Sequence, residues 1–247
     1  MRIYRLQIRI IQLSVILTMI IMVFGLVNVW LANGESVPAG GEDPITGGNQ
    51  NPTETQVPQT EDPGEKNKPV NTKIVCLGDS YTIGWPGEAK NSWPARLAEI
   101  LKVEVINAGK TYQNTGDLLE RFEQDVVAHQ PGRVIIFAGV GDALRDKPFE
   151  EFQSNIKALV EKAEANHIIP ILAYTIPYPG TEELYKAYRE WEEAYALEKK
   201  IMVLDFKQVL FDEDGKIIKD YADKNYPNYP NKEGHAAMAD YAARVLQ

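Results

Sequence analysis

The stretch Lys73-Ile74-Val75-Cys76-Leu77-Gly78-Asp79-Ser80-Tyr81-Thr82 decides the fold of this chain. Its first half is a short apolar run rich in β-branched residues, which predicts a strand over 73–77. The glycine that follows allows a tight turn into polar residues. Comparable runs occupy residues 103–106, 133–137, 168–174 and 201–206. The sequence therefore predicts five strands.

Helical patterns fill the intervals between these runs. Apolar residues recur at helical spacing in three sets, which are Leu118/Phe122/Val126, Phe149/Phe152/Ile156/Leu159/Val160 and Leu184/Tyr188/Trp191/Tyr195. We expect the aromatic stripe of the last set to face the core. Strict alternation of strand and helix predicts a parallel sheet covered on both faces. The expected fold class is therefore α/β, a three-layer α/β/α sandwich with a flavodoxin-like parallel sheet of five strands. If its strand order is the flavodoxin-like 2-1-3-4-5, the segments that follow the first three strands lie next to one another.

Composition and charge exclude several classes of protein. The chain has 247 residues, 44% hydrophobic and 25% charged, which is ordinary globular composition. Its formal net charge of −9 disfavours nucleic-acid binding, because phosphate backbones would be repelled. One cysteine and three histidines leave no disulfide framework and no basis for a zinc site of Cys and His, so we expect no metal.

The N-terminal segment predicts a membrane anchor over residues 1–32. Residues 10–32 carry no charge, whereas Arg2, Arg5 and Arg9 precede them. At 1.5 Å per residue this run reaches about 34 Å, enough to cross a bilayer core. The basic flank should remain cytoplasmic, which makes the protein a single-pass protein of the cell membrane with an extracytoplasmic C-terminal part. A cleaved signal peptide is the competing interpretation, but its apolar region is usually shorter.

The next segment predicts a flexible tether. Residues 33–70 contain six prolines, six glycines and few apolar residues. Such a stretch buries too little surface to offset its ordering entropy. We therefore expect a disordered extracytoplasmic linker over 33–72 and one folded domain over 73–247.

Three glycine-bearing turns are expected to converge in this domain. They are Gly78-Asp79-Ser80-Tyr81, Asn107-Ala108-Gly109 and Gly139-Val140-Gly141-Asp142, each directly after a predicted strand. In an open parallel sheet, ligands bind beyond the carboxyl ends of the strands where the strand order reverses. A small-molecule site is therefore expected around Ser80.

These three turns resemble three sequence blocks of the SGNH (GDSL) family of serine esterases and lipases. The resemblance covers nearly all of residues 73–247 and implies the fold predicted above. It implies that Ser80 is the nucleophile and that the Gly109 amide contributes to an oxyanion hole. It also implies hydrolysis of acyl or acetyl esters of lipids or glycans, without a cofactor.

The chain departs from the family pattern at two places. Gly141 stands where the third block has an asparagine, so one oxyanion donor is missing. The last block supplies a histidine in the family, whereas this chain repeats Tyr-Pro-Asn. Aligned from the C-terminal side, Tyr229 takes the place of the histidine; aligned from Asp223, Tyr226 does. A phenol with a pKa near 10 is a poor proton acceptor at neutral pH.

Three further residues have a structural and a catalytic interpretation. His235 is the only nearby imidazole, although packing of the last helix is the simpler role. Asp142 is expected to hold its loop by hydrogen bonds, with action as an unusual base for Ser80 as the alternative. Asp79 is expected to cap the turn or helix that follows it.

Three functions follow from these observations. The first is a membrane-anchored, extracytoplasmic serine ester hydrolase of weak activity. The second is a catalytically impaired family member that binds a ligand or partner at the same cleft. The third, a phosphate-binding loop over residues 80–84, leaves the second and third blocks unexplained.

Overall fold

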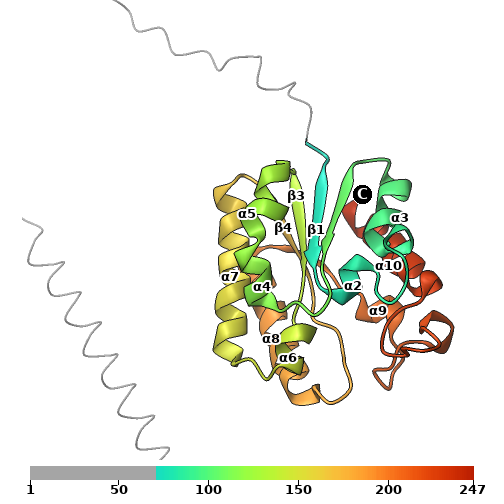
Figure 1. The fold of residues 1–247 in the computed structure, drawn as a ribbon. Coiled ribbons are helices and arrows are strands. Elements are labelled where there is room, and N and C mark those ends of the chain that lie inside the picture. Colours follow the sequence, from blue (N-terminus) through green and yellow to red (C-terminus); the bar gives the residue numbers. More distant parts are fainter. Residues whose placement is uncertain (1–70) are drawn as a thin grey trace, which may run out of the picture. The chain divides into compact units, whose positions relative to one another are not determined.

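A parallel sheet of five strands forms the centre of the domain, as the computed structural model, which describes residues 71–247, shows (Figure 1). The strands are β1 (Ile74–Gly78), β2 (Val105–Gly109), β3 (Arg133–Phe137), β4 (Ile169–Ala173) and β5 (Met202–Leu204). Their order is β2-β1-β3-β4-β5, which confirms the predicted flavodoxin-like α/β sheet. The register pairs Gly78 with Gly109 on one side and with Phe137 on the other. The first three strands therefore end level with one another, and the turns after them meet at one edge.

Helices cover both faces of the sheet (Figure 1). On one face lie α2 (Ser80–Ile83), α3 (Trp93–Leu101), α9 (Lys207–Leu210) and α10 (Lys232–Leu246). On the other lie α4 (Thr115–Glu120), α5 (Phe122–Asp125), α6 (Val140–Leu144), α7 (Phe149–Ala165) and α8 (Glu182–Lys199). Successive side chains of a strand point to opposite faces of the sheet, so they pack into two separate apolar cores. Cys76 lies in the first core and Leu77 in the second. The chain is therefore a three-layer sandwich.

Short 3₁₀ turns connect several of these elements. They span Ala89–Asn91, Val127–His129 and Lys219–Tyr221. The helical pattern over 118–126 does not form one helix, because α4 ends at Glu120 and α5 begins at Phe122, with Arg121 between them. The guanidinium of Arg121 lies at this break and donates to the carbonyl oxygens of Ala108 and Gly78, at the ends of β2 and β1. The aromatic stripe of α8 faces the core as expected, with Tyr188 and Tyr195 buried.

The predicted anchor over 1–32, and all of the predicted linker except Asn71 and Thr72, lie outside the described residues. Within residues 71–247, no helix has the length and apolar character needed to cross a membrane. Asn71 packs against the domain, since its side-chain amide donates to the carbonyl oxygen of Gln130 at 2.9 Å.

Candidate functional site

Ser80 lies at the carboxyl ends of the parallel strands, in the segment where β1 is followed by α2. Asp79 caps this short helix, because its Oδ1 accepts a hydrogen bond from the Tyr81 amide at 2.9 Å. The Ser80 residue is 6% exposed, so only a small part of its surface reaches solvent. Gly78 is required at the preceding position, because a Cβ there would lie 2.1 Å from Thr82 Oγ1. The turn is therefore packed tightly around the serine.

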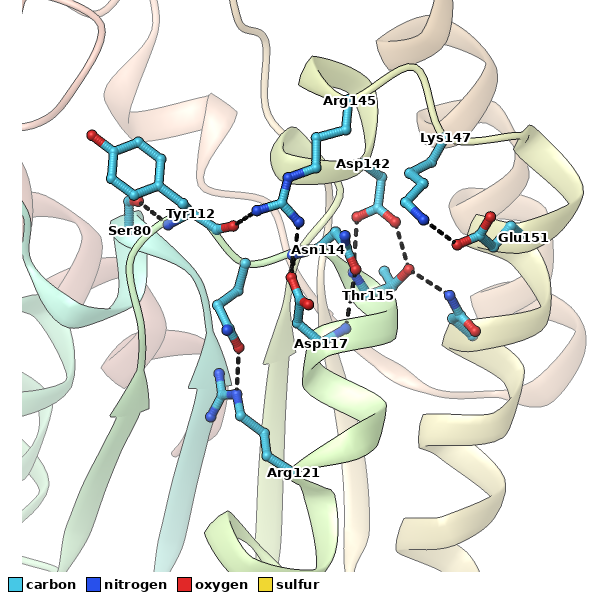
Figure 2. Close-up of polar contacts among 12 residues, drawn as sticks. Ser80, Tyr112, Asn114, Thr115, Asp117, Arg121, Asp142, Arg145, Lys147 and Glu151 are labelled. Carbon is cyan, nitrogen blue, oxygen red and sulfur yellow. Dashed lines mark hydrogen bonds and ion pairs between the residues drawn. The ribbon is translucent and has the colours of Figure 1, made fainter.

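The Tyr112 amide is the hydrogen-bond partner of the Ser80 hydroxyl. Tyr112 N donates to Ser80 Oγ at 3.1 Å (Figure 2). The Gly109 amide, expected to face the serine, donates instead to the Asn107 side chain at 3.0 Å. Gly109 has a different role, since a Cβ there would lie 2.2 Å from the Ile83 amide nitrogen. The absence of a side chain at Gly109 lets α2 approach β2 closely. The amide that donates to Ser80 belongs to Tyr112, in the loop that follows β2.

Gly141 makes room for this same loop. A Cβ at Gly141 would lie 2.1 Å from the carbonyl oxygen of Gln113. The backbone next to Tyr112 therefore occupies the space that an asparagine side chain would need. Because position 141 is glycine and not asparagine, the loop that carries Gln113 can approach α6 closely.

Asp142 joins the third turn to the start of α4. Its two carboxylate oxygens accept hydrogen bonds from the Thr115 amide at 3.0 Å and from Thr115 Oγ1 at 2.5 Å (Figure 2). Asn155 of α7 also donates to Thr115 Oγ1. Asp142 is buried, and burial raises the pKa of its carboxyl group. Asp142 thus holds its loop and has no hydrogen bond to Ser80.

The repeated Tyr-Pro-Asn segment divides into a buried and an exposed tyrosine. Tyr229 stacks on Tyr81 with ring centroids 4.9 Å apart and meets the edge of Trp85 at 4.6 Å. Burial, with a further contribution from the neighbouring Tyr178, raises the pKa of Tyr229 above that of a free phenol. Tyr226 is 47% exposed and lies against Trp85. Tyr229 therefore packs against the residue that follows Ser80, whereas Tyr226 is the more exposed of the two tyrosines.

The histidines do not contact the serine. His235 lies in α10, and neither of its ring nitrogens has a hydrogen-bond partner among the described residues. Burial lowers its pKa to about 4, so the imidazole is neutral at physiological pH. His129 precedes β3 and His167 precedes β4, which places both at the opposite edge of the sheet. Over residues 71–247, Ser80 Oγ has no hydrogen bond to an imidazole or a carboxylate.

Two other buried carboxyl groups lie near this edge. Burial raises the pKa of Asp79 to about 7. Glu192 of α8 is 1% exposed and accepts a hydrogen bond from the Thr175 amide at 2.8 Å, directly after β4. Burial raises the pKa of Glu192 to about 8. Near neutral pH, both groups are therefore in part protonated.

An apolar cavity of about 400 Å³ lies beside the Tyr-Pro-Asn segment. Its apolar walls are formed by Pro177, Pro179, Phe211, Ile217, Ala222 and Pro227. Asn228 also lines it, and the carbonyl oxygen of Asn228 accepts a hydrogen bond from the Tyr81 hydroxyl at 2.6 Å. Asn228 therefore lines the cavity and also contacts the residue that follows Ser80. No cluster of three or more potential metal-binding side chains occurs in the part of the chain described here.

Sequence reasoning missed the loop between β2 and α4 and the two arginines that hold it. Tyr112 has a φ of 58°, and the residues around it in the sequence do not predict this left-handed conformation. Arg121 stands four residues before Asp125, and this helical spacing could have indicated their ion pair. Arg145 contacts Tyr112 across more than thirty residues of chain, so only the fold brings them together.

The fold and the turn geometry define a class of protein: a three-layer α/β domain that presents a serine directly after its first strand, at the switch point of the sheet. The GDSL-like Lipase/Acylhydrolase family matches residues 76–237. The chain belongs to this family.

Individual relatives agree with this assignment. A structure of a G-D-S-L family protein from Desulfitobacterium hafniense DCB-2 is 53% identical, with a TM-score of 0.70, and covers 71% of this chain and 100% of its own. Thioesterase 1/protease 1/lysophospholipase L1 of Escherichia coli is 24% identical over 70% of this chain and 83% of its own length. An arylesterase of Vibrio mimicus is 33% identical over 37% of this chain, and the match spans about half, 48%, of that protein.

Proposed function

We propose that this protein is a serine ester hydrolase of low turnover that acts on acyl or acetyl esters of lipids or glycans. The observation that carries the proposal is the Ser80 hydroxyl at the sheet edge, 3.1 Å from the Tyr112 amide. Family membership and the esterase and thioesterase names of its relatives support this reaction class. The neighbouring apolar cavity supports a substrate with an apolar acyl group.

In the proposed reaction, Ser80 Oγ attacks the ester carbonyl carbon and the carbonyl oxygen becomes an oxyanion. The Tyr112 N–H, which already points at Oγ, then donates to this oxyanion. The Ser80 proton passes to solvent hydroxide, because Ser80 Oγ has no side-chain base within residues 71–247. The carbon–oxygen bond to the alcohol then breaks, and the departing alkoxide takes a proton from water, which regenerates the hydroxide. In the second step a water molecule hydrolyses the acyl-serine ester, which releases the carboxylic acid and restores the Ser80 hydroxyl.

Low turnover follows from the missing groups. Removing one member of a serine triad typically leaves about 10³- to 10⁴-fold rate enhancement over water. Removing one oxyanion donor costs roughly a further 10²- to 10³-fold. Here the tyrosine at 229 and the glycine at 141 remove one group of each kind.

The proposal includes anchoring in the cell membrane by residues 1–32, with the domain outside the cytoplasm. The uncharged run over 10–32 and the arginines before it support this location. Fusion of a reporter enzyme active only outside the cytoplasm to the C-terminus tests it. Activity of the reporter, together with retention in the membrane fraction, is the expected result.

A fluorophosphonate probe tests the reaction, because it labels only an activated serine. We expect slow labelling of the full chain in detergent micelles, lost in Ser80→Ala and retained in Ser154→Ala, which changes an exposed serine of α7. Slow hydrolysis of a short-chain nitrophenyl ester should follow the same pattern. Absence of labelling from pH 6 to pH 10, with the fold intact by circular dichroism, would refute the enzyme and favour a ligand-binding role.

A further inference from the structure

We propose that Arg145 is a positioning residue, which holds the backbone of Tyr112 so that the Tyr112 N–H faces the Ser80 hydroxyl. This inference rests on the proposed function, because the amide matters only if Ser80 reacts. Arg145 does not touch Ser80, and it acts through the loop between β2 and α4.

The backbone conformation of Tyr112 requires external support. Its φ of 58° lies in the left-handed region, which is sterically unfavourable for any residue other than glycine. The tyrosine ring gives little compensation, because Tyr112 is 68% exposed. Contacts to the backbone of the loop must therefore hold this conformation.

Arg145 supplies such a contact from the end of α6. Its guanidinium donates to the carbonyl oxygen of Tyr112 and also pairs with Asp117 Oδ2 at 2.9 Å (Figure 2). The same Asp117 oxygen accepts a hydrogen bond from the Asn114 amide at 2.9 Å, as part of the capping box of α4. One planar side chain thus ties the strained residue to the first turn of the helix that follows it.

The electrostatics of Asp117 agree with this arrangement. Partial burial opposes ionisation of its carboxyl group. The hydrogen bond from the Asn114 amide and the pair with Arg145 outweigh burial and hold the pKa of Asp117 below its usual value. Asp117 is therefore ionised over the whole working pH range and offers Arg145 a permanent partner.

Arg121 holds the neighbouring residue but is a poor subject for a test. Its Nε donates to Gln113 Oε1 at 2.6 Å. Its side chain is only 9% exposed and also binds the carbonyl oxygens at the ends of β1 and β2, so its removal would disturb the sheet. The Arg145 side chain is 42% exposed, so its removal leaves the core intact.

The primary experiment compares Arg145→Ala with the wild-type full chain in micelles. We expect kcat and the rate constant of fluorophosphonate labelling to fall about 10- to 100-fold, with KM changed less than twofold. Hydrogen–deuterium exchange of the peptide spanning 110–114 should accelerate, while the melting temperature changes little. Arg145→Lys should recover part of the rate, because one ammonium group replaces only part of the planar fork.

A second substitution separates positioning from a general effect of charge. In the Arg145→Ala background, Tyr112→Gly should restore the labelling rate several-fold, because glycine adopts a positive φ without a steric penalty. Lys162→Ala is the matched control, since it removes an exposed pair with Glu123 at 2.7 Å on the same face of the sheet and should change neither rate nor exchange.

The possible failures are distinguishable. Wild-type protein that is never labelled at Ser80 refutes the proposed function, and the positioning role with it. Wild-type labelling combined with unchanged rates and unchanged exchange in Arg145→Ala refutes the positioning role alone. A lower yield of labelled sites at a normal rate per site would show a purely structural role and would also overturn the inference.

Discussion

Replacing Glu192 by glutamine should stabilise the protein at alkaline pH and leave its stability unchanged at acid pH. Glu192 is 1% exposed and accepts a hydrogen bond from the Thr175 amide at 2.8 Å. A glutamine at this position keeps a carbonyl oxygen for that bond. It removes the ionisation, and with it the cost of placing a charge in the interior.

The magnitude follows from the shifted pKa. Burial raises the pKa of Glu192 from 4.5 to about 8. Below pH 4.5 the carboxyl group is protonated in both the folded and the unfolded state, so it adds no pH dependence. Between pH 4.5 and 8 only the unfolded state loses its proton, so the folded state is destabilised as pH rises. At 1.36 kcal/mol per pKa unit, the full effect is about 5 kcal/mol above pH 8 and about 3 kcal/mol at pH 7.

Urea unfolding followed by tryptophan fluorescence between pH 4.5 and pH 9 measures this difference. The gap in unfolding free energy between Glu192→Gln and wild type should open steadily across that range. Asp79 titrates in both proteins, so its contribution cancels in the difference. Asp142 is electrostatically coupled to Glu192, so the measured gap includes the effect of the Glu192 charge on Asp142. Glu190→Gln is the matched control, because Glu190 is exposed on the same helix. A gap between Glu192→Gln and wild type that does not vary with pH would falsify the buried, protonated state of Glu192.

Three further predictions concern the proposed reaction. Tyr229→His should raise ester hydrolysis at pH 7 by about 10-fold or more, because an imidazole accepts the Ser80 proton where a phenol of raised pKa does not; an unchanged rate would mean that position 229 does not face the serine. The wild-type rate should keep rising above pH 8 without a plateau, since solvent hydroxide takes the proton, and a plateau near pH 7 in kcat/KM would show instead that a protein group with a pKa near 7 takes part. Gly141→Asn should destabilise the domain by about 1–3 kcal/mol and give no gain in rate, because its Cβ would lie 2.1 Å from the Gln113 carbonyl oxygen; thermal unfolding and ester turnover test the two statements.

Several features of the fold were predictable because their causes are local. Each strand is a short run of mainly apolar residues, and the first three strands end at a glycine or within two residues of one. Alternating strands and helices predict a parallel sheet with crossovers of one hand, but the order β2-β1-β3-β4-β5 is one of several that this rule allows. The turn at Ser80 was predictable for the same reason, since Asp79 caps the helix through a residue only two positions away.

The identity of the amide that faces Ser80 was decided by tertiary structure. Gly109 was the natural expectation from sequence, yet its amide is satisfied within its own turn, by Asn107. Tyr112 takes the position because Arg145, Arg121 and the gap at Gly141 shape its loop from other parts of the chain. A left-handed tyrosine is unfavourable by itself, and no pattern of neighbouring residues predicts it.

Sequence alone thus determined the layers and the place of the serine, since hydrophobic periodicity and glycine turns act over a few residues. Only the folded chain decided which groups surround Ser80 Oγ. Tyr112 lies 32 residues from Ser80 along the chain and meets it at 3.1 Å, because two strand ends and a helix terminus are packed at one edge of the sheet. Contacts of this range depend on the packing of the whole domain, and local sequence patterns do not encode them.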